Sequence, residues 1–288
     1  MRIPSTDKLF RHHKATYLRI DDSFITSRVA ILVNMITRDQ PTIFTPDVIA
    51  AVSAKREGNL SFHAGLDHQH VPAYRRAWLS SLGVAMEQTA VVKVNDPERW
   101  DIIHDTSLAD AERGTESLDT AIIADALVTN QPGIALLLLT ADCNPIILFD
   151  PNNRVLALAH AGWQSTDVHL AEKVVWHMQQ QYGSKPADIR VYIGPAIKKE
   201  SYVFVKPQQA DWPAWKPFLS KAGEDGEVAI DLPGYNRQQL LDAGVLADHI
   251  QVCPTDTATD PDYFSHYRAT RSGDLTDDGR FATVCMMK

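Results

Sequence analysis

Apolar residues gather in short runs along this chain, and these runs are rich in Val, Ile and Leu. Such runs predict β-strands at Ile134–Thr140, Ile146–Asp150, Val155–His160, Ile189–Gly194 and Phe281–Met286. Consecutive apolar positions within several of them are typical of strands that are buried on both faces. We therefore expect the core of the protein to be built on sheets.

Longer segments have the apolar spacing of helices. They are Val71–Leu82, Asp167–Tyr182 and Tyr235–Ala243. Helices interspersed with strands predict a layered α/β domain. Two polar stretches, Asn95–Thr120 and Ser272–Asp278, lack this periodicity and predict loops. The first is long for a compact domain, and loops of that length are often functional.

Composition narrows the class of protein. The chain has 288 residues, of which 44% are hydrophobic, and no Gly/Ser-rich linker divides it, so we expect one domain over residues 1–288. The net charge of -8 argues against a nucleic-acid partner, because phosphate-tracking surfaces are basic. Three widely spaced cysteines do not suggest a disulfide framework. No signal peptide or membrane span is evident, and we expect a cytoplasmic protein.

The segment from Cys143 to His160 predicts a β-hairpin. Its centre, Asp150-Pro151-Asn152-Asn153, is typical turn sequence. If these four residues form the loop, Phe149 faces Arg154, and in the same register Cys143 faces His160. Their Cβ atoms would then lie about 4.5–5.5 Å apart on one face of the sheet. A slip of one residue would move one of them to the opposite face.

A facing Cys and His have two functional uses. A thiolate and an imidazole are good zinc ligands, and a catalytic zinc usually has three protein ligands and a water. Alternatively, the imidazole of His160 lowers the pKa of the Cys143 thiol and makes it a nucleophile. A buried cysteine packed beside a hydrogen-bonded histidine is an equally weighted structural explanation.

The segment that follows His160 leads into the predicted helix near Asp167. Ser165 or Thr166 can cap this helix. A helix start so close to His160 would favour an anion such as phosphate, although every helix has such an end.

Short motifs from Asn59 onward, in this order, resemble the laccase-domain (YfiH/YlmD-like) family. Roughly the first 45 residues carry none of them and diverge. The motifs are Asn59-Leu60-Ser61-Phe62-His63-Ala64-Gly65, Ala124-Asp125-Ala126-Leu127-Val128-Thr129, Thr140-Ala141-Asp142-Cys143, His160-Ala161-Gly162-Trp163, Ile193-Gly194-Pro195, Asp231-Leu232 with Asn236 and Gln239-Leu240, Phe264-Ser265-His266-Tyr267-Arg268, and Gly279-Arg280.

The resemblance implies a single layered α/β domain with two packed mixed β-sheets flanked by helices. It also implies phosphorolysis of purine nucleosides such as adenosine and inosine, with phosphate as the second substrate. Some relatives cleave methylthioadenosine or deaminate adenosine, and a bacterial branch is linked to peptidoglycan editing. A zinc ion is expected on a histidine and on the residues matching Cys143 and His160.

The chain departs from the family pattern in two places. The family's first zinc ligand usually lies in a Gln-Val-His-Gly motif, and the nearest match here places Asn95 where the histidine belongs. His104 in the same loop can substitute as the third ligand, and His63 is another candidate. Gln164 and Ser165 follow the His-Ala-Gly-Trp motif, where a basic residue and Gly are normal.

Further residues are candidates for substrate contacts. Arg268 and Arg280 can clamp phosphate or ribose oxygens, and surface ion pairs are the alternative explanation for both. Trp163 can stack on a base or belong to the core. Asp142 can orient His160 or contact the substrate, or bond only to local backbone. His63 is a further candidate for binding substrate.

Other functions remain open on the sequence alone. A copper laccase is disfavoured, because only His68 and His70 among 11 histidines form a His-x-His pair. A cysteine hydrolase or amidase would use Cys143 and His160 as a dyad. A degenerate, non-catalytic family member would keep the fold and lose the metal.

Overall fold

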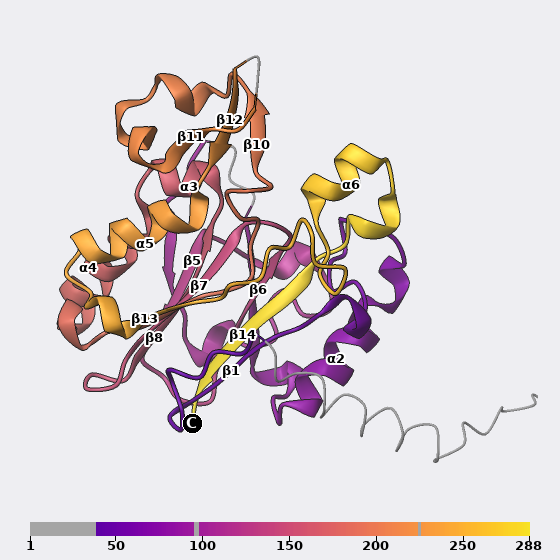
Figure 1. Ribbon diagram of the computed structural model, residues 1–288. Helices are drawn as coiled ribbons and strands as arrows, with labels where there is room; N and C mark the ends of the chain where they lie inside the picture. Colours follow the sequence, from indigo (N-terminus) through magenta and orange to yellow (C-terminus); the bar gives the residue numbers. More distant parts are fainter. Residues whose placement is uncertain (1–38, 95–97, 224–225) are drawn as a thin grey trace, which may run out of the picture. The chain divides into compact units, whose positions relative to one another are not determined.

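Two large mixed β-sheets form the body of the protein in the computed structural model, which describes residues 39–94, 98–223 and 226–288 (Figure 1). In spatial order, the first sheet contains β1 (Val48–Val52), β14 (Phe281–Met287), β6 (Ala135–Thr140), β2 (Thr89–Lys93) and β4 (Ile122–Ile123). The second contains β13 (Ile250–Val252), β9 (Arg190–Ile193), β7 (Asn144–Asp150), β8 (Val155–Ala161), β5 (Ala126–Thr129) and β3 (Ile103–Asp105).

The two sheets pack face to face through alternate residues of their strands. On β8, Leu156 and Leu158 join the same core as Leu136 and Leu138 of β6. This core also contains Phe281 at the start of β14. All five side chains are at most 1% exposed, so the space between the sheets is closed to water at their level.

Helices cover the outer faces of both sheets (Figure 1). The other residues of β8, Ala157 and Ala159, pack beside α4 (Leu170–Tyr182) and α5 (Leu232–Asp242). On the far side, α2 (Val71–Ser81) packs against β6 and β14. The layers therefore run helix, sheet, sheet, helix, which confirms the predicted α/β class with two packed mixed sheets. The described residues, all of which lie between 39 and 288, form one compact unit.

A third, small sheet stands beside this body. It is formed by β10 (Val203–Val205), β12 (Glu227–Ile230) and β11 (Leu219–Lys221). Its aromatic base holds Trp215, whose indole Nε1 donates to Asp167 Oδ1 at 2.7 Å. Asp167 ends α3 (Trp163–Asp167), so the small sheet is fixed to the helix that follows His160.

The predicted strands are all found, and β7 begins two residues earlier than expected. The helix predicted over Asp167–Tyr182 is α4, which begins three residues later, at Leu170, and a separate short helix, α3, precedes it. His169 separates them, because it adopts the left-handed conformation with φ 60°. Neither Ser165 nor Thr166 is the cap we expected: both lie inside α3, which Gly162 precedes.

The two remaining helices end close to their predicted limits. α2 covers the first prediction almost completely. α5 begins three residues earlier than Tyr235, because Asp231 Oδ1 accepts from the Gly234 amide at 2.9 Å and caps a first turn that contains Pro233. Part of the predicted Asn95–Thr120 loop is strand β3, which pairs with β5.

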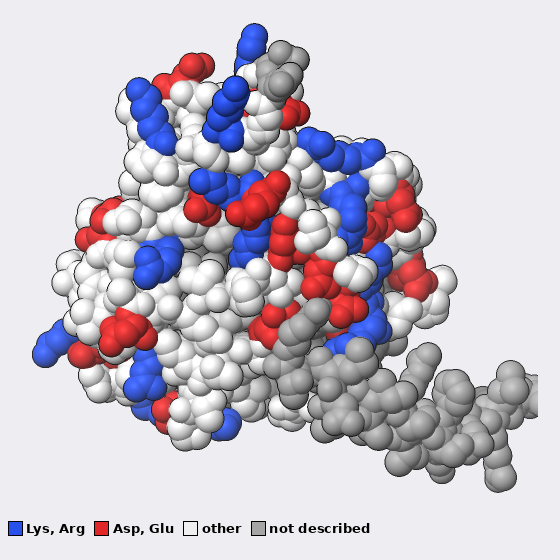
Figure 2. Space-filling view, in the orientation of Figure 1, with Lys and Arg blue, Asp and Glu red and all other residues white. Residues whose placement is uncertain are grey.

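The surface carries mixed charge. On the face shown in Figure 2, Lys and Arg side chains lie among Asp and Glu rather than in one basic patch. Across the described ranges, no helix combines the length and apolar character that crossing a membrane requires.

Candidate active site at the sheet edge

The hairpin β7–β8 forms, but in a different register from the predicted one. Asp150 pairs with Val155, and His160 lies opposite Pro145 instead of Cys143. The prediction of a facing Cys143 was therefore wrong. The Asp150 carboxylate accepts hydrogen bonds from the amides of Asn152 and Asn153, at 2.9 and 3.2 Å. Because these bonds start the turn after Asp150, Asp150 itself is the last residue of its strand.

The slip is two residues, an even number, so it leaves the relevant side chains on the same face. Cys143 immediately precedes β7, and His160 is the penultimate residue of β8. Both adjoin Gly162: a Cβ on this glycine would lie 3.1 Å from Cys143 Sγ and 3.2 Å from His160 Cε1. The thiol and the imidazole therefore both flank the bare backbone of Gly162, and no hydrogen bond joins them among the described residues.

Burial controls the ionisation of this pair. It raises the pKa of the Cys143 thiol to about 12, with the Asp142 charge acting in the same direction and Arg280 against it. It lowers the pKa of His160 to about 4, and the Arg280 charge adds to the effect. At neutral pH the pair is thus a thiol beside a neutral imidazole. Within the described part of the chain, His160 Nδ1 is buried without a hydrogen-bond partner.

Asp142 does not contact His160 through any hydrogen bond found in the described ranges. Its two carboxylate oxygens accept from Thr257 Oγ1 and from the Tyr267 amide, each at 2.7 Å. Burial raises the pKa of Asp142 in spite of these bonds. Its backbone has φ 79°, in the left-handed region. Asp142 therefore ties the turn before Cys143 to the start of α6 (His266–Ser272).

A basic cavity of about 440 Å³ opens beside His160. Lys93 at the end of β2, Arg280 before β14 and the exposed His63 supply its polar lining, and Trp100 is among its apolar walls. Burial, and then the charges of Arg280 and Lys93, lower the pKa of His63. No carboxylate is among the described residues that line this cavity. Its chemistry suits an anion.

An aromatic cavity of about 430 Å³ opens beside Cys143. Its walls are mostly apolar. They come from the turn before β7, from α3, from the small sheet and from α6: Ala141, Asp142, Trp163, Gln164, Tyr202, Phe204, His266, Tyr267, Thr270 and Arg271. The Tyr202 and Phe204 rings pack edge to face, with centroids 4.9 Å apart. Flat aromatic walls of this kind suit a planar ligand.

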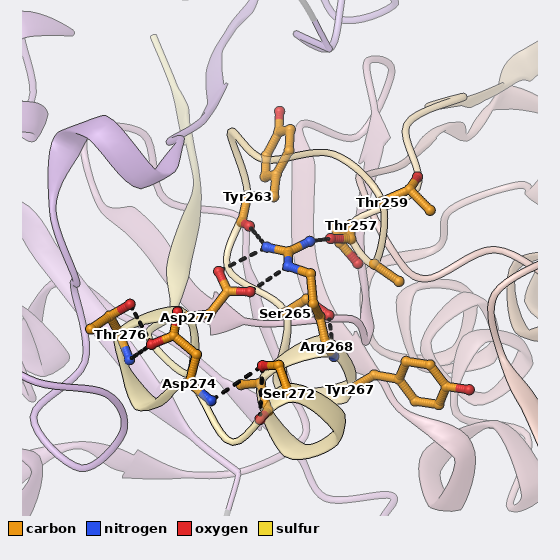
Figure 3. A network of polar contacts seen from close by, with 12 residues as sticks. Thr257, Thr259, Tyr263, Ser265, Tyr267, Arg268, Ser272, Asp274, Thr276 and Asp277 are labelled. Carbon is orange, nitrogen blue, oxygen red and sulfur yellow. Dashed lines mark hydrogen bonds and ion pairs between the residues drawn. The ribbon is translucent and has the colours of Figure 1, made fainter.

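Arg268 belongs to a different environment (Figure 3). Its guanidinium contacts the Asp277 carboxylate through Nε and Nη2. Nη1 donates to Thr257 O at 2.6 Å and Nη2 to Tyr263 O at 2.7 Å. The guanidinium points inward to these acceptors, and Arg268 is therefore placed to hold α6 and the preceding loop together. Arg280, in contrast, lines the basic cavity and bonds Asp278 Oδ1 at 3.0 Å.

The donors among the described residues do not make a complete zinc site. Cys143 and His160 are suitable ligands, and the unpartnered Nδ1 of His160 is compatible with a metal. His104, however, lies on β3 with its Nε2 3.4 Å from Asp110 Oδ2. Nowhere in the described ranges do three His, Cys, Asp or Glu side chains gather to hold a metal. Asn95 lies outside the described residues.

Several lining residues were not singled out from the sequence. The only sequence signal for Lys93 is its place two residues before Asn95, in the segment that matches the family's Gln-Val-His-Gly motif. Tyr202, Phe204 and Tyr267 come from segments with no chemical signature, and only the packing of the small sheet against α6 brings them to Cys143. Gln164 was noted as a departure from the family pattern, and it lines the aromatic cavity.

The fold and the site at the sheet edge agree with the family that the motifs indicated. The chain belongs to the laccase-domain family, since the family model described as "Multi-copper polyphenol oxidoreductase laccase" matches residues 49–288.

Named relatives give a finer comparison. The chain is 33% identical to purine nucleoside phosphorylase YlmD of Geobacillus stearothermophilus over 217 residues, which cover 73% of this chain and 78% of that protein. It is 29% identical to purine nucleoside phosphorylase YlmD of Bacillus subtilis, over 62% of this chain and 64% of that one. The crystal structure of YlmD from Geobacillus stearothermophilus superposes with a TM-score of 0.77 at 28% identity, covering 88% of this chain and 97% of that one. YfiH of Bacillus licheniformis gives a TM-score of 0.75 at 29% identity, covering 84% and 93%.

Proposed function

We propose that this protein is a purine nucleoside phosphorylase that acts on adenosine and inosine. The observation that carries the proposal is a pair of cavities, one lined by His160 and the other by Cys143, two residues that both flank Gly162. One cavity is basic and the other is aromatic. Phosphorolysis needs both, because an anion and a planar base must be held on either side of one sugar carbon. The relatives named as purine nucleoside phosphorylases support the same assignment.

In this proposal phosphate binds in the basic cavity. Lys93 and Arg280 supply the positive charge, and the uncharged His63 ring can share a hydrogen bond with a phosphate oxygen. The purine binds between the aromatic walls, with Trp163 available for stacking. The ribose then spans the Cys143–His160 pair.

The reaction moves the ribosyl group from nitrogen to oxygen. A phosphate oxygen forms a bond to C1′ as the C1′–N9 bond breaks, and the electron pair leaves with the purine, which gains a proton to balance the one that the hydrogen phosphate loses. Positive charge develops on the sugar next to the bound phosphate. The negative charge of a phosphate that is already held in place stabilises it and lowers the barrier. The neutral imidazole of His160 can hydrogen-bond the sugar or the leaving base.

The direct test supplies adenosine, inosine or methylthioadenosine with phosphate and measures ribose 1-phosphate or its methylthio analogue. Phosphate-dependent release of the free base is expected. Ammonia release from adenosine without phosphate would report deamination instead. Complete inactivity toward all three nucleosides at high enzyme concentration, with and without added zinc, would count against the proposal.

A zinc ion needs a test of its own, because Cys143 and His160 alone do not complete a site among the described residues. Metal analysis of the purified protein tests its involvement. One zinc per chain would mean that a further group completes the coordination around Cys143 and His160. Phosphorolysis by metal-free protein would mean that charge and positioning suffice.

A cysteine hydrolase is the second candidate, because the thiol and the imidazole adjoin at Gly162. The raised pKa of Cys143 disfavours a thiolate nucleophile. Thiol alkylation distinguishes a zinc ligand from a nucleophile. Protection of Cys143 by zinc would indicate a ligand. Hydrolysis of an amide or ester that stops on alkylation would indicate a nucleophile. A protein inert in all these assays would be the non-catalytic family member.

A further inference from the structure

The polar groups of the aromatic cavity are mostly engaged with the protein. Both oxygens of Asp142 accept hydrogen bonds. Arg271 donates to Val203 O at 3.0 Å, and its guanidinium lies 4.5 Å from the centre of the Tyr267 ring. His266 Nδ1 pairs with Asp278 Oδ1 at 2.8 Å. These three side chains are therefore committed before any ligand enters.

Gln164 differs from them. Gln164 lines the cavity, and its side-chain amide makes no hydrogen bond to any residue in the described ranges. Tyr202 and Thr270 offer single hydroxyl groups, so Gln164 is the one carboxamide among the described lining residues. A carboxamide presents a donor and an acceptor side by side, which a hydroxyl does not.

The backbone that carries Gln164 is held firmly. It is the second residue of α3, and its carbonyl accepts from the Val168 amide at 3.1 Å. The helix is anchored by Thr166, whose hydroxyl donates to Gly162 O at 2.7 Å and accepts from Asn236 Nδ2 at 2.9 Å. A side-chain amide without a partner on a rigid backbone is well placed to form specific hydrogen bonds to a ligand.

We propose that Gln164 is a specificity-determining residue that hydrogen-bonds the N1–C6 edge of the purine base in the aromatic cavity. This rests on the proposed function. Adenine presents an acceptor at N1 beside the donor 6-amino group. Hypoxanthine presents a donor at N1 beside the acceptor O6. A half-turn of the terminal amide matches either pattern, so Gln164 accepts both 6-amino and 6-oxo purines.

The experiment compares wild type with Gln164→Glu and Gln164→Met. A carboxylate finds two adjacent donors only on guanine, where the 2-amino group adjoins N1–H, so its contact moves by one ring position from the N1–C6 edge to the N1–C2 edge. On the N1–C6 edge of adenine it meets one donor and the opposing lone pair of N1. Gln164→Glu should raise the guanosine-to-adenosine ratio of kcat/KM and of affinity on the order of tenfold. Gln164→Met keeps the length of the side chain and should weaken the binding of adenosine, inosine and guanosine by about tenfold each. The guanosine-to-adenosine ratio should therefore stay nearly constant.

Gln180→Glu, the same chemical change at an exposed position of α4, is the matched control and should leave the ratio unchanged. Binding is measured by calorimetry with adenosine, inosine and guanosine, independently of turnover. Selective binding that depends on Gln164 without ribose 1-phosphate formation would refute the phosphorylase and keep this inference. An unchanged ratio in a folded Gln164→Glu variant, or no binding of any nucleoside by wild type at millimolar concentration, would overturn it.

Discussion

At the scale of single residues, the missing side chain of Gly162 decides how closely the thiol and the imidazole approach. Its φ of −77° is accessible to any residue, so conformational freedom is not the reason for glycine here. The reason is space, because a Cβ would lie 3.1 Å from Cys143 Sγ and 3.2 Å from His160 Cε1. Both atoms would have to move.

Gly162→Ala should therefore lower kcat/KM for phosphorolysis by about five- to tenfold, since the neighbouring atoms must shift by a few tenths of an ångström and a displacement of about 1 Å at a reacting centre costs about a hundredfold. Ser165→Ala is the control on the same helix: it removes a buried hydroxyl that has no partner among the described residues, and it should keep full activity. Thermal unfolding checks that both variants fold. Full activity in Gly162→Ala would show that the pair is not at the reacting centre.

Arg280 should act on phosphate specifically. Arg280→Met removes a charge from the basic cavity and should raise the KM for phosphate by about tenfold or more, with a smaller change in the KM for the nucleoside. Arg76→Met removes an exposed arginine that pairs with Glu87 and Glu116, and should change neither constant. Equal effects of the two substitutions would argue against a phosphate role for this cavity.

At the scale of elements, α6 is held in place from two sides. Asp142 accepts a hydrogen bond from the Tyr267 amide in the first turn of α6. Arg268 links α6 to Asp277 and to two backbone carbonyls (Figure 3). This explains why the sequence motif that contains Arg268 carries no free cation to the site. The motif builds a wall of the aromatic cavity instead.

Arg268→Met should accordingly lower the free energy of unfolding by about 2–4 kcal/mol, because it leaves the buried Asp277 carboxylate without its main partner. Chemical denaturation measures this change. The KM for phosphate should remain within about twofold of wild type in the folded fraction. A raised KM with unchanged stability would instead support a phosphate clamp.

Asp277 makes this element sensitive to acid. Burial acts to raise the pKa of Asp277, but the bonds from Arg268 and Lys55 outweigh it and the pKa is lowered. A lowered pKa in the folded state adds stability above the pKa of the unfolded chain and loses it as the pH falls through the folded value. Asp277→Asn should thus flatten the loss of stability below about pH 4. Parallel wild-type and variant curves from pH 6 to about pH 3 would contradict this.

At the scale of the whole molecule, the inter-sheet core and the site are continuous. Leu156 and Leu158 of β8 fill the space between the sheets, and His160 continues the same face of the strand to the edge, where the basic cavity begins. A ligand that binds only this folded arrangement stabilises the entire fold.

Phosphate should therefore raise the thermal midpoint of the wild type. At a concentration about 100 times its Kd, mass action adds about 2.7 kcal/mol, or about 5–10 °C for a protein of this size. Chloride at equal ionic strength is the control. The shift should be smaller in Arg280→Met, and a shift of equal size with chloride would mean that phosphate acts only through screening.

The amino-acid pattern alone was enough to predict five strands of the two large sheets, most helix limits, and the shared face of Cys143 and His160. These depend on the period of side chains along one stretch of backbone, which a contiguous pattern records. The ordered motifs were likewise sufficient for the family, because they need only be present in the chain.

The register of the hairpin, the inward course of Arg268 and the two cavities could be seen only once the chain was folded. The register depends on how the Asp150 carboxylate caps its turn, and the turn composition alone allowed another pairing. Lys93, Tyr202 and Tyr267 come to the site from distant parts of the chain. Their positions follow from long-range packing between layers, which leaves no local period in the sequence.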